Sequence, residues 1–241
     1  MFPTNGPHRQ EAVFTVVGVL KAKDLPPVKG SRQVFRFFIN TTTLTQQRRS
    51  LKADRLQYAR QHATLAGWDA PSFKKALENM QEAAYTMYSA FSEDAIEPWR
   101  PEVSDPHNAE ISSNCRYFTV GRNIPVDSRT KFHPRTDPHG VLTRFLSDGV
   151  AHCFDNDVMY MASFSVSSPI PYITLRRYVE KDPGTFKTGD IVEMGFAFVA
   201  WKKPGKNVGP DWSCMLVLRT LTFLDGQFTK VRILFERSCN F

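Results

Sequence analysis

The pattern of apolar and polar positions predicts β-strands near the start of the chain. Residues 12–20 are almost all β-branched, aliphatic or aromatic, a composition that is typical of a strand. A turn with two prolines and a glycine follows at Asp24–Gly30, and Val34–Ile39 then resumes an apolar β pattern. The N-terminal part is therefore expected to begin with a long-looped β-hairpin.

Two segments that follow have the spacing of α-helices. Leucine and alanine recur weakly every three to four residues within Ser50–Ala66, which predicts a short basic helix. Farther along, apolar residues recur at i, i+3, i+4 and i+7 over Ser72–Phe91, with lysine and glutamate on the opposite side. This second segment predicts one long amphipathic helix that packs on a sheet.

A proline-rich acidic stretch then interrupts the regular pattern. Residues 98–113 contain three prolines and three acidic residues, which predicts an exposed loop or a linker. It separates residues 1–97, with the N-terminal hairpin and the helical segment, from a β-rich region at 114–241. That region could form one domain together with the N-terminal part.

The second half of the chain is dominated by β patterns. Short β segments are predicted at Arg116–Val120, Val150–Phe154, Val158–Val166 and Tyr172–Val179. Because Asp and Asn favour turns, the cluster at 155–157 predicts a hairpin between the second and third of these segments. Two longer apolar runs at 189–201 and 212–224, separated by a basic loop, predict an antiparallel pair of long strands.

These elements together place the fold in the α+β class. We expect an antiparallel sheet or a partly open β-barrel, built from both ends of the chain, with one long packed helix. The specific expectation is a barrel similar to the oligonucleotide-binding (OB) fold in residues 145–241.

Composition and cysteine usage bound the kind of protein. The chain has 241 residues, of which 41% are hydrophobic and 23% charged, as in ordinary globular proteins. No stretch approaches the roughly 18–20 consecutive apolar residues of a membrane span. The four cysteines, at 115, 153, 214 and 239, form no CxxC pair and are expected to be free thiols. We therefore expect a soluble intracellular protein, nuclear or cytoplasmic, that does not bind membranes.

The positive charge lies at the two ends of the chain. Of the net charge of +7, residues 1–60 carry +8 and residues 201–241 carry +4, whereas the middle is acidic. Proteins that bind single-stranded nucleic acid combine a cationic groove with aromatic side chains on which bases stack. The basic and aromatic candidates for such a site are Arg32, Arg36, Arg48, Arg49, Trp201, Lys202, Lys203 and Lys206.

These features favour a non-enzymatic nucleic-acid-binding protein with a preference for single strands. The alternative is a protein-interaction or scaffold module. The common hydrolase, nucleotide and metalloprotease motifs are absent from the sequence, and no cofactor is expected. A third hypothesis is a metal-dependent enzyme at His133, Asp137 and His152, although the prolines around these residues are more typical of a turn.

Several motifs of the second half also occur together in a known family. They are Phe132–Leu142, His152–Asn156, Gly189–Glu193 and Met215–Asp225. In these motifs the chain resembles a multicopy, uncharacterised protein family of mushroom-forming fungi. Because that family has no assigned activity, the resemblance implies no catalytic residue.

Overall fold

The structure is a computed structural model that describes residues 11–28, 59–92, 95–105, 108–167, 174–203 and 210–226. This part of the chain contains eleven β-strands and one α-helix, α2 (Pro71–Tyr88). The strands are β1 (Phe14–Asp24), β2 (Arg60–Ala66), β3 (Ile96–Glu97), β4 (Glu102–Asp105), β5 (Asn108–Arg116), β6 (Thr119–Val120), β7 (Val150–Ala151), β8 (Met159–Ser167), β9 (Thr174–Glu180), β10 (Ile191–Lys202) and β11 (Trp212–Asp225). Short 3₁₀ turns lie at Val126–Ser128, Thr143–Phe145, Phe154–Asn156 and Pro183–Thr185.

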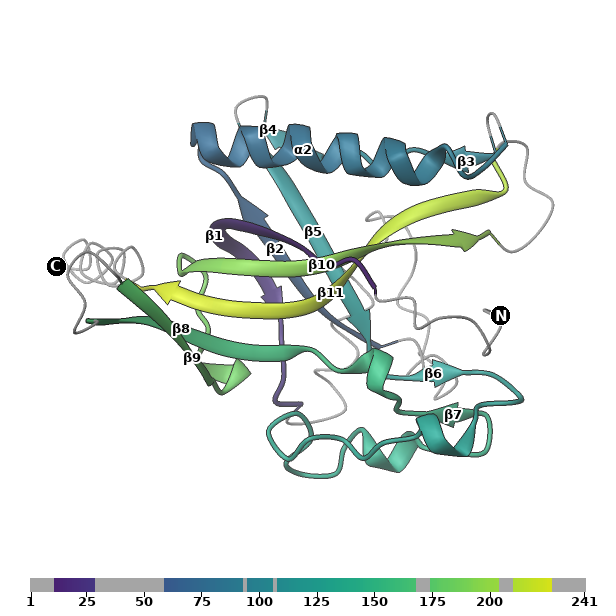
Figure 1. The fold of residues 1–241 in the computed structure, drawn as a ribbon. Helices are drawn as coiled ribbons and strands as arrows, with labels where there is room; N and C mark the ends of the chain where they lie inside the picture. The colour runs from purple at the N-terminus through teal and green to yellow at the C-terminus, as the bar shows by residue number, and fades with distance from the viewer. Residues whose placement is uncertain are drawn as a thin grey trace, which may run out of the picture.

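Five of the strands close into a barrel in the order β1, β2, β5, β11 and β10 (Figure 1). Every neighbouring pair in this ring is antiparallel except β5 and β11, which are parallel where Asn114 lies opposite Val217. A ring with an odd number of strands cannot alternate in direction all the way round, so one pairing has to be parallel. The expected antiparallel sheet or partly open barrel is therefore corrected to a closed, mixed barrel, which is built from both ends of the chain as expected. The barrel expected within residues 145–241 is wrong, because β1, β2 and β5 supply three of the five strands.

Further strands extend the sheet beyond the ring. β8 pairs in parallel with β11, β9 pairs with β8, and β4 pairs with β5. The hairpin expected around residues 155–157 is wrong, because β7 pairs with β6 while β8 turns back into β9. Residues 155 and 156 lie instead in the 3₁₀ turn Phe154–Asn156, which separates the two strands.

Alternate side chains of the ring fill the barrel interior. The innermost residues are Leu20, Leu65, Ile111, Met194, Phe196, Leu218 and Leu221. In β2 the inward side chains are Gln61, Ala63 and Leu65, which lie opposite the inward side of β5. The helix expected to run as far as Ala66 is therefore wrong over the described residues 59–66, because pairing with β1 and β5 imposes a period of two on this segment.

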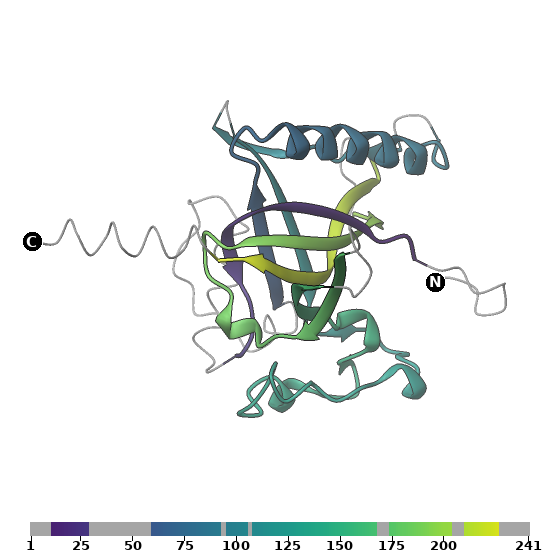
Figure 2. The same ribbon diagram turned by 60° about the vertical axis from the view of Figure 1, so that its left-hand side comes forward.

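α2 confirms the expected long packed helix and lies along one side of the barrel (Figures 1 and 2). Its buried side chains are Phe73, Leu77, Met80 and Ala84, spaced by three or four residues as in an amphipathic helix. The Phe73 ring occupies the space beside two glycines. A Cβ atom would lie 2.8 Å from this ring at Gly18 and 2.3 Å at Gly67, so both glycines are required for the close approach.

The opposite side of the barrel is covered by the segment between β6 and β8 (Figure 2). A second apolar cluster forms there around Tyr117, Phe118 and Leu142, apart from the barrel core. Residues 98–113, expected to be a loop or linker, instead contain β4 and the first part of β5. These strands join the N-terminal and C-terminal parts in one sheet, because β5 pairs with both β2 and β11.

Only the first strand of the expected N-terminal hairpin lies in the described part of the chain. β1 pairs with β2 on one side and with β10 on the other, whereas Val34–Ile39 falls outside the described residues. The long antiparallel pair expected at 189–201 and 212–224 is confirmed as β10 and β11, which stay paired from Ile191–Asp225 to Lys202–Trp212.

Three of the four cysteines lie in the described part, and all three are free thiols: Cys115, Cys153 and Cys214. Burial raises the pKa of the Cys115 thiol to about 11, and burial likewise raises the pKa of Cys214 to about 11. Both therefore remain protonated and weakly nucleophilic at neutral pH. Within the same residues, no helix has the length and apolar character needed to cross a membrane.

Candidate nucleic-acid interface

A row of polar side chains covers the outside of the barrel where β2 and β5 pair. The register places Arg60 opposite Arg116, His62 opposite Asn114, and Thr64 opposite Ser112. Because successive side chains of a strand point to opposite faces, these six point outward while their neighbours fill the core. We call this surface the β2–β5 face.

One end of the β2–β5 face is positively charged. Arg60 donates a hydrogen bond to Asn114 Oδ1 at 2.7 Å, and Arg116 is exposed. Neither guanidinium has an acidic partner within 4.0 Å among the described residues. Burial, and then the charge of Arg116, lower the pKa of Arg60. Like charges directly opposite in an antiparallel pair are destabilising, so this end of the face is suited to bind an anion.

The other end of the face carries carboxylates. Ser112 donates a hydrogen bond to Glu102 Oε2 at 3.0 Å, and Lys21 pairs with Glu110. A cleft of about 380 Å³ opens here, and its lining includes His62, Asp24 and Glu102. Burial lowers the pKa of His62 more than these two carboxylates raise it. The charge of the face therefore changes from positive at its arginine end to negative at this cleft.

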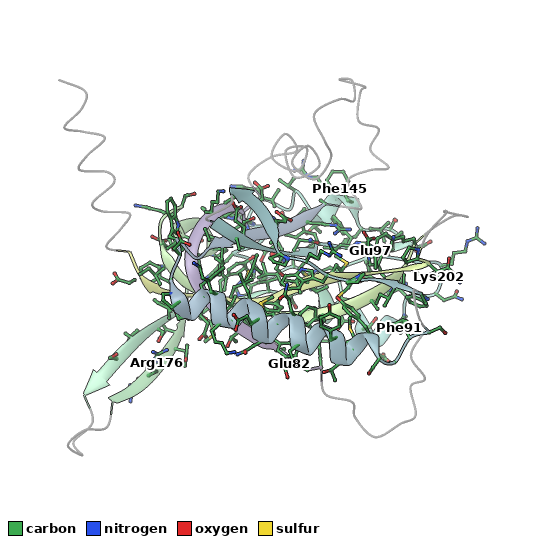
Figure 3. The ribbon with its side chains drawn as sticks, turned by 90° about the horizontal axis from the view of Figure 1, so that it is seen from above. Glu82, Phe91, Glu97, Phe145, Arg176 and Lys202 are labelled. Carbon is green, nitrogen blue, oxygen red and sulfur yellow. The ribbon has the colours of Figure 1, made fainter. Side chains whose placement is uncertain are left out.

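The sequence candidates in the connection from β10 to β11 lie at another end of the barrel. Trp201 is 41% exposed and Lys202 is exposed. Lys203 instead donates to Glu97 Oε2 at 2.7 Å, an ion pair that reduces its availability to a ligand. Figure 3 shows Lys202 and Glu97 at the end of the molecule where β3 pairs with β11. Lys206 lies outside the described residues.

The remaining candidates, Arg32, Arg36, Arg48 and Arg49, also lie outside the described residues. They belong to the connection from β1 to β2, in which residues 29–58 contain seven basic residues and one acidic residue. Both flanks of this connection are anchored. Val28 N–H donates to the Thr136 carbonyl at 3.1 Å, and the Ala59 carbonyl accepts from Tyr117 N–H at 3.0 Å. Ala59 and Tyr117 directly adjoin the arginine pair.

The structure therefore supplies two site residues that the sequence analysis missed. Arg60 falls in the segment expected to be helical, and Arg116 begins a predicted short strand with no sequence signal that links the two. Their proximity follows only from the pairing of β2 with β5. The sequence candidates Trp201 and Lys202 are both exposed at the end of β10, which extends through Lys202.

The structure gives the three residues of the metal-site hypothesis other partners. Asp137 accepts hydrogen bonds from the backbone N–H groups of Leu142 and Thr143, at 3.1 and 2.8 Å, which confirms the predicted turn. Buried His152 contacts the Tyr117 carbonyl through Nδ1 and Asp157 through Nε2.

Exposed His133 has its own partners. It lies 3.4 Å from a carboxylate oxygen of Glu180 and accepts a hydrogen bond from the backbone N–H of Arg135. In the described part of the chain, no group of three or more His, Cys, Asp or Glu residues is arranged to hold a metal ion.

The fold and this surface define a closed, mixed β-barrel with one packed helix and a polar outer face that carries an arginine pair. No protein-family model matches the chain, and no curated protein matches it. Among solved structures, the chain is similar to the crystal structure of gp2.5, a single-stranded DNA binding protein encoded by bacteriophage T7. The TM-score is 0.38 and the sequence identity 11%, over 90% of this chain and 87% of that chain.

Proposed function

We propose that this protein binds single-stranded nucleic acid on the β2–β5 face and is not an enzyme. The first support is the connectivity of the ring. Its first three strands, β1, β2 and β5, follow one another around the barrel, and its fifth, β11, lies between the third and the fourth. This is the Greek-key order of an OB-like barrel, which binds ligands on its second and third strands and with the loops after its first and fourth strands.

The observation that carries the proposal is the arginine pair. Arg60 and Arg116 face each other at a cost in stability and have no acidic partner in the described residues. Guanidinium groups bind phosphate through two parallel hydrogen bonds. The flanks of the strongly basic connection 29–58, Val28 and Ala59, pack in one apolar cluster with Tyr117, which directly follows Arg116.

A single strand fits this surface better than a duplex. α2, the α-helix of the described part, pairs its exposed lysines locally, Lys74 with Asp69 at 2.8 Å and Lys75 with Glu78 at 3.0 Å. It therefore presents no free basic face for a DNA groove. Trp201, half-exposed at the end of β10, instead provides a flat aromatic surface on which an unpaired base can stack.

Three substitutions at the end of β10 test whether a strand bound on the β2–β5 face also contacts this end of the barrel. Removing Lys202 should make the dependence of log affinity on log salt shallower by about 0.7, the value for one phosphate contact on a single strand. Lys203→Ala is the matched control and should change the slope less, because Lys203 is paired with Glu97. Trp201→Ala should weaken binding by about 1–3 kcal/mol without changing the slope, since stacking releases no counterions. Fluorescence anisotropy with labelled oligothymidylate measures all three, and no binding at low salt by the folded protein would refute the proposal.

His62 gives the binding a defined dependence on pH. Because burial lowers its pKa, His62 is neutral in the free protein at pH 7. A bound polyanion favours the protonated form, so the affinity should rise as the pH falls below 6.5, by at most about tenfold per pH unit. His62→Gln should remove this increase, whereas the same change at exposed His139 should not. Anisotropy titrations between pH 7.5 and about 5.5 measure the effect.

The stability of the free protein should change with pH in the opposite direction. The unfolded chain binds a proton at His62 more readily than the folded chain, so the contribution of this residue to stability is present above pH 6.5 and decreases below it.

The affinity for oligonucleotide is the quantity that tests the role of His62 in binding. If the affinity of the unaltered protein stays constant between pH 7.5 and about 5.5, this contradicts a bound phosphate near His62.

A protein-interaction role is the second candidate function, and a separate observation favours it. The hairpin of β8 and β9 projects from the body of the protein (Figure 3). It exposes Phe164, Tyr178 and Val179, each between 44% and 46% exposed. Phe164 and Val179 share one face of the hairpin, whereas Tyr178 points to the other, and an exposed apolar pair on a projecting hairpin suits a contact with another protein. If the folded protein binds no oligonucleotide at low salt, this role becomes the first candidate.

A further inference from the structure

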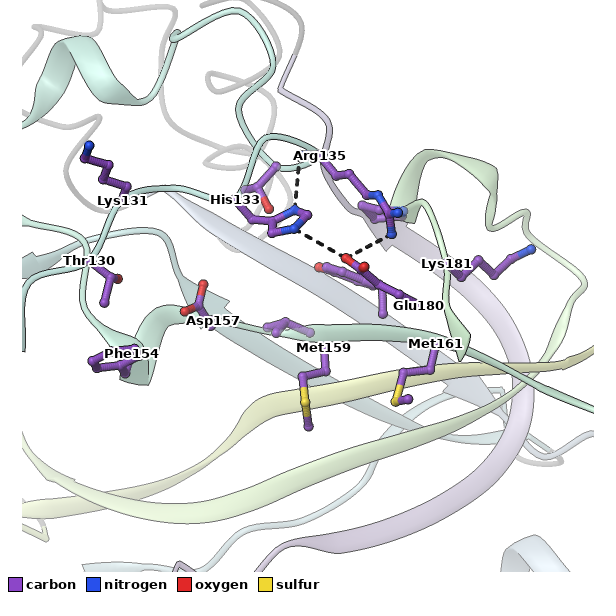
Figure 4. A pocket seen from close by; sticks show the side chains of 14 residues that line it. Thr130, Lys131, His133, Arg135, Phe154, Asp157, Met159, Met161, Glu180 and Lys181 are labelled. Atoms are coloured by element: carbon purple, nitrogen blue, oxygen red, sulfur yellow. Dashed lines mark hydrogen bonds and ion pairs between the residues drawn. The ribbon is translucent and has the colours of Figure 1, made fainter. Parts of the chain in front are cut away.

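A groove of about 480 Å³ lies between the segment that follows β6 and the strands β8 and β9 (Figure 4). Its walls are residues 130–136, the turn Phe154–Asn156 with the start of β8, and residues 180–183. None of the sequence candidates for nucleic-acid binding lines it. We call it the Phe154 groove. Its volume is within the range of about 300–1,000 Å³ that is usual for small-molecule sites.

The floor of the Phe154 groove is apolar and presented on a rigid support. Phe154 is 68% exposed and Met159 is 60% exposed. The turn that carries Phe154 is fixed by two hydrogen bonds between Cys153 and Asn156, at 2.8 and 2.9 Å. The Asn156 carbonyl also accepts a bond from Gln61 of β2 at 3.0 Å. The aromatic ring is therefore held toward solvent by the barrel itself.

Cations surround this apolar floor. Lys131 is exposed and has no hydrogen bond or ion pair within the described residues. Arg135 pairs with Glu180 at 2.9 Å, and Glu180 also lies 3.4 Å from His133. The Lys181 ammonium lies 4.4 Å from the centre of the Phe223 ring. The lining holds three cations, Lys131, Arg135 and Lys181, against two carboxylates, Asp157 and Glu180, so the groove keeps an excess of positive charge.

The Phe154 groove is coupled to the arginine end of the β2–β5 face through one buried histidine. Tyr117 follows Arg116, and its carbonyl lies 3.0 Å from His152 Nδ1. The other ring nitrogen of His152 contacts Asp157, and the backbone carbonyl of His152 accepts a hydrogen bond from Thr130 N–H at 2.9 Å. Asp157 and Thr130 both line the groove. These contacts place the groove next to the end of β5 that carries Arg116.

We infer that the Phe154 groove binds one nucleotide of the same single strand, farther along it. The base stacks on Phe154, and the adjoining phosphate is bound by Lys131 and Arg135. Aromatic stacking beside a cation is the combination that holds single strands without sequence preference. This inference rests on the proposed function and adds to it a second binding region, formed by the segments between β6 and β10 rather than by the barrel ring.

The test compares a short oligothymidylate of about 8 nucleotides with a long one of about 24, because one OB barrel covers about 4–16 nucleotides. The short oligonucleotide occupies only the β2–β5 face, whereas the long one also reaches the Phe154 groove. Phe154→Ala should weaken binding of the long strand roughly 5- to 150-fold and that of the short strand little. Tyr85→Ala is the matched control, because Tyr85 is also 68% exposed but lies on α2.

Two charge variants are expected to change the binding of the long strand in opposite directions. Lys131→Ala should make the salt dependence for the long strand shallower by about 0.7. Glu180→Gln should tighten binding of the long strand, because it releases Arg135 from its ion pair. If Phe154→Ala is unstable, Phe154→Leu takes its place. Leucine keeps the apolar bulk but removes the aromatic face, so this variant should also weaken binding of the long strand.

The outcomes separate the groove from the face. If both strands bind but neither Phe154 nor Lys131 affects the long one, the groove inference is wrong and the proposed function stands. The same holds if the groove variants weaken binding of a labelled polyglutamate peptide and leave the long strand unaffected. If the unaltered, folded protein binds neither strand at low salt, the proposed function and the groove inference are both refuted.

Discussion

Replacing Arg60 and Arg116 together with alanine is expected to weaken binding of oligothymidylate by about 100-fold or more. The estimate follows from charge-assisted hydrogen bonds, which contribute about 1.5–3 kcal/mol each. The salt dependence should become shallower by about 1.4, for two phosphate contacts. Anisotropy titrations over a range of salt concentrations measure both quantities. The matched control removes Arg176 and Arg177 from β9, which changes the net charge equally but leaves the β2–β5 face intact.

The same substitutions should leave the fold intact, and this separates a binding role from a structural one. Arg116 faces a like charge across the strands, so Arg116→Ala should keep or raise the free energy of unfolding, by up to about 1 kcal/mol. Urea denaturation measures the change. A large loss of stability in Arg116→Ala would mean that the pair supports the barrel. An unchanged affinity in the double variant would remove the β2–β5 face from the binding site.

Removing the Phe73 ring should lower the free energy of unfolding by about 3–5 kcal/mol, as for other buried aromatic residues. Phe73 is 3% exposed and fills the space left by Gly18 and Gly67, so Phe73→Ala opens a cavity between α2 and the barrel. Urea denaturation followed by circular dichroism measures the loss. Tyr85→Ala, on the exposed side of the same helix, should change stability by no more than about 0.5 kcal/mol. A loss below about 1 kcal/mol for Phe73→Ala would contradict the packing of α2 on these glycines.

The elements that could be predicted from sequence are those with a strong local pattern. α2 repeats buried residues every three or four positions, and only a helix places such residues on one side. β10 and β11 are long runs of apolar and β-branched residues bounded by turns. Each signal lies within a single segment, so no knowledge of the partner strands was needed.

β2 was misassigned because its own sequence does not decide its structure. Ala63 and Ala66 fit the spacing of a helix, but in the strand they point to opposite sides, and only Ala63 lies in the barrel interior. The strand form is selected by two partners, β1 and β5, that lie far away in the sequence. Strand preference is set largely by such neighbours, so a segment without a strong pattern cannot reveal it alone.

The candidate site shows the same division. Trp201 and Lys202 are adjacent in sequence and could be found there. Arg60 and Asn114, which hydrogen-bond on the β2–β5 face, are 54 positions apart, and their contact depends on the register of two strands. A register shift by one residue would turn every one of these side chains into the core. The arginine pair therefore depends on the fold, and no local sequence motif predicts it.

The parallel contact between β5 and β11 also determines when the barrel can close during synthesis of the chain. Ser113 of β5 hydrogen-bonds the Leu216 carbonyl of β11 across 103 positions of the chain. Before β11 leaves the ribosome, β10 keeps an unpaired edge, and so does β5 beyond residues 108–110, which pair with β4. Open edges pair readily with other chains. Contacts over such distances also form slowly. Until β11 pairs with both strands, these open edges therefore expose the nascent chain to association with other chains.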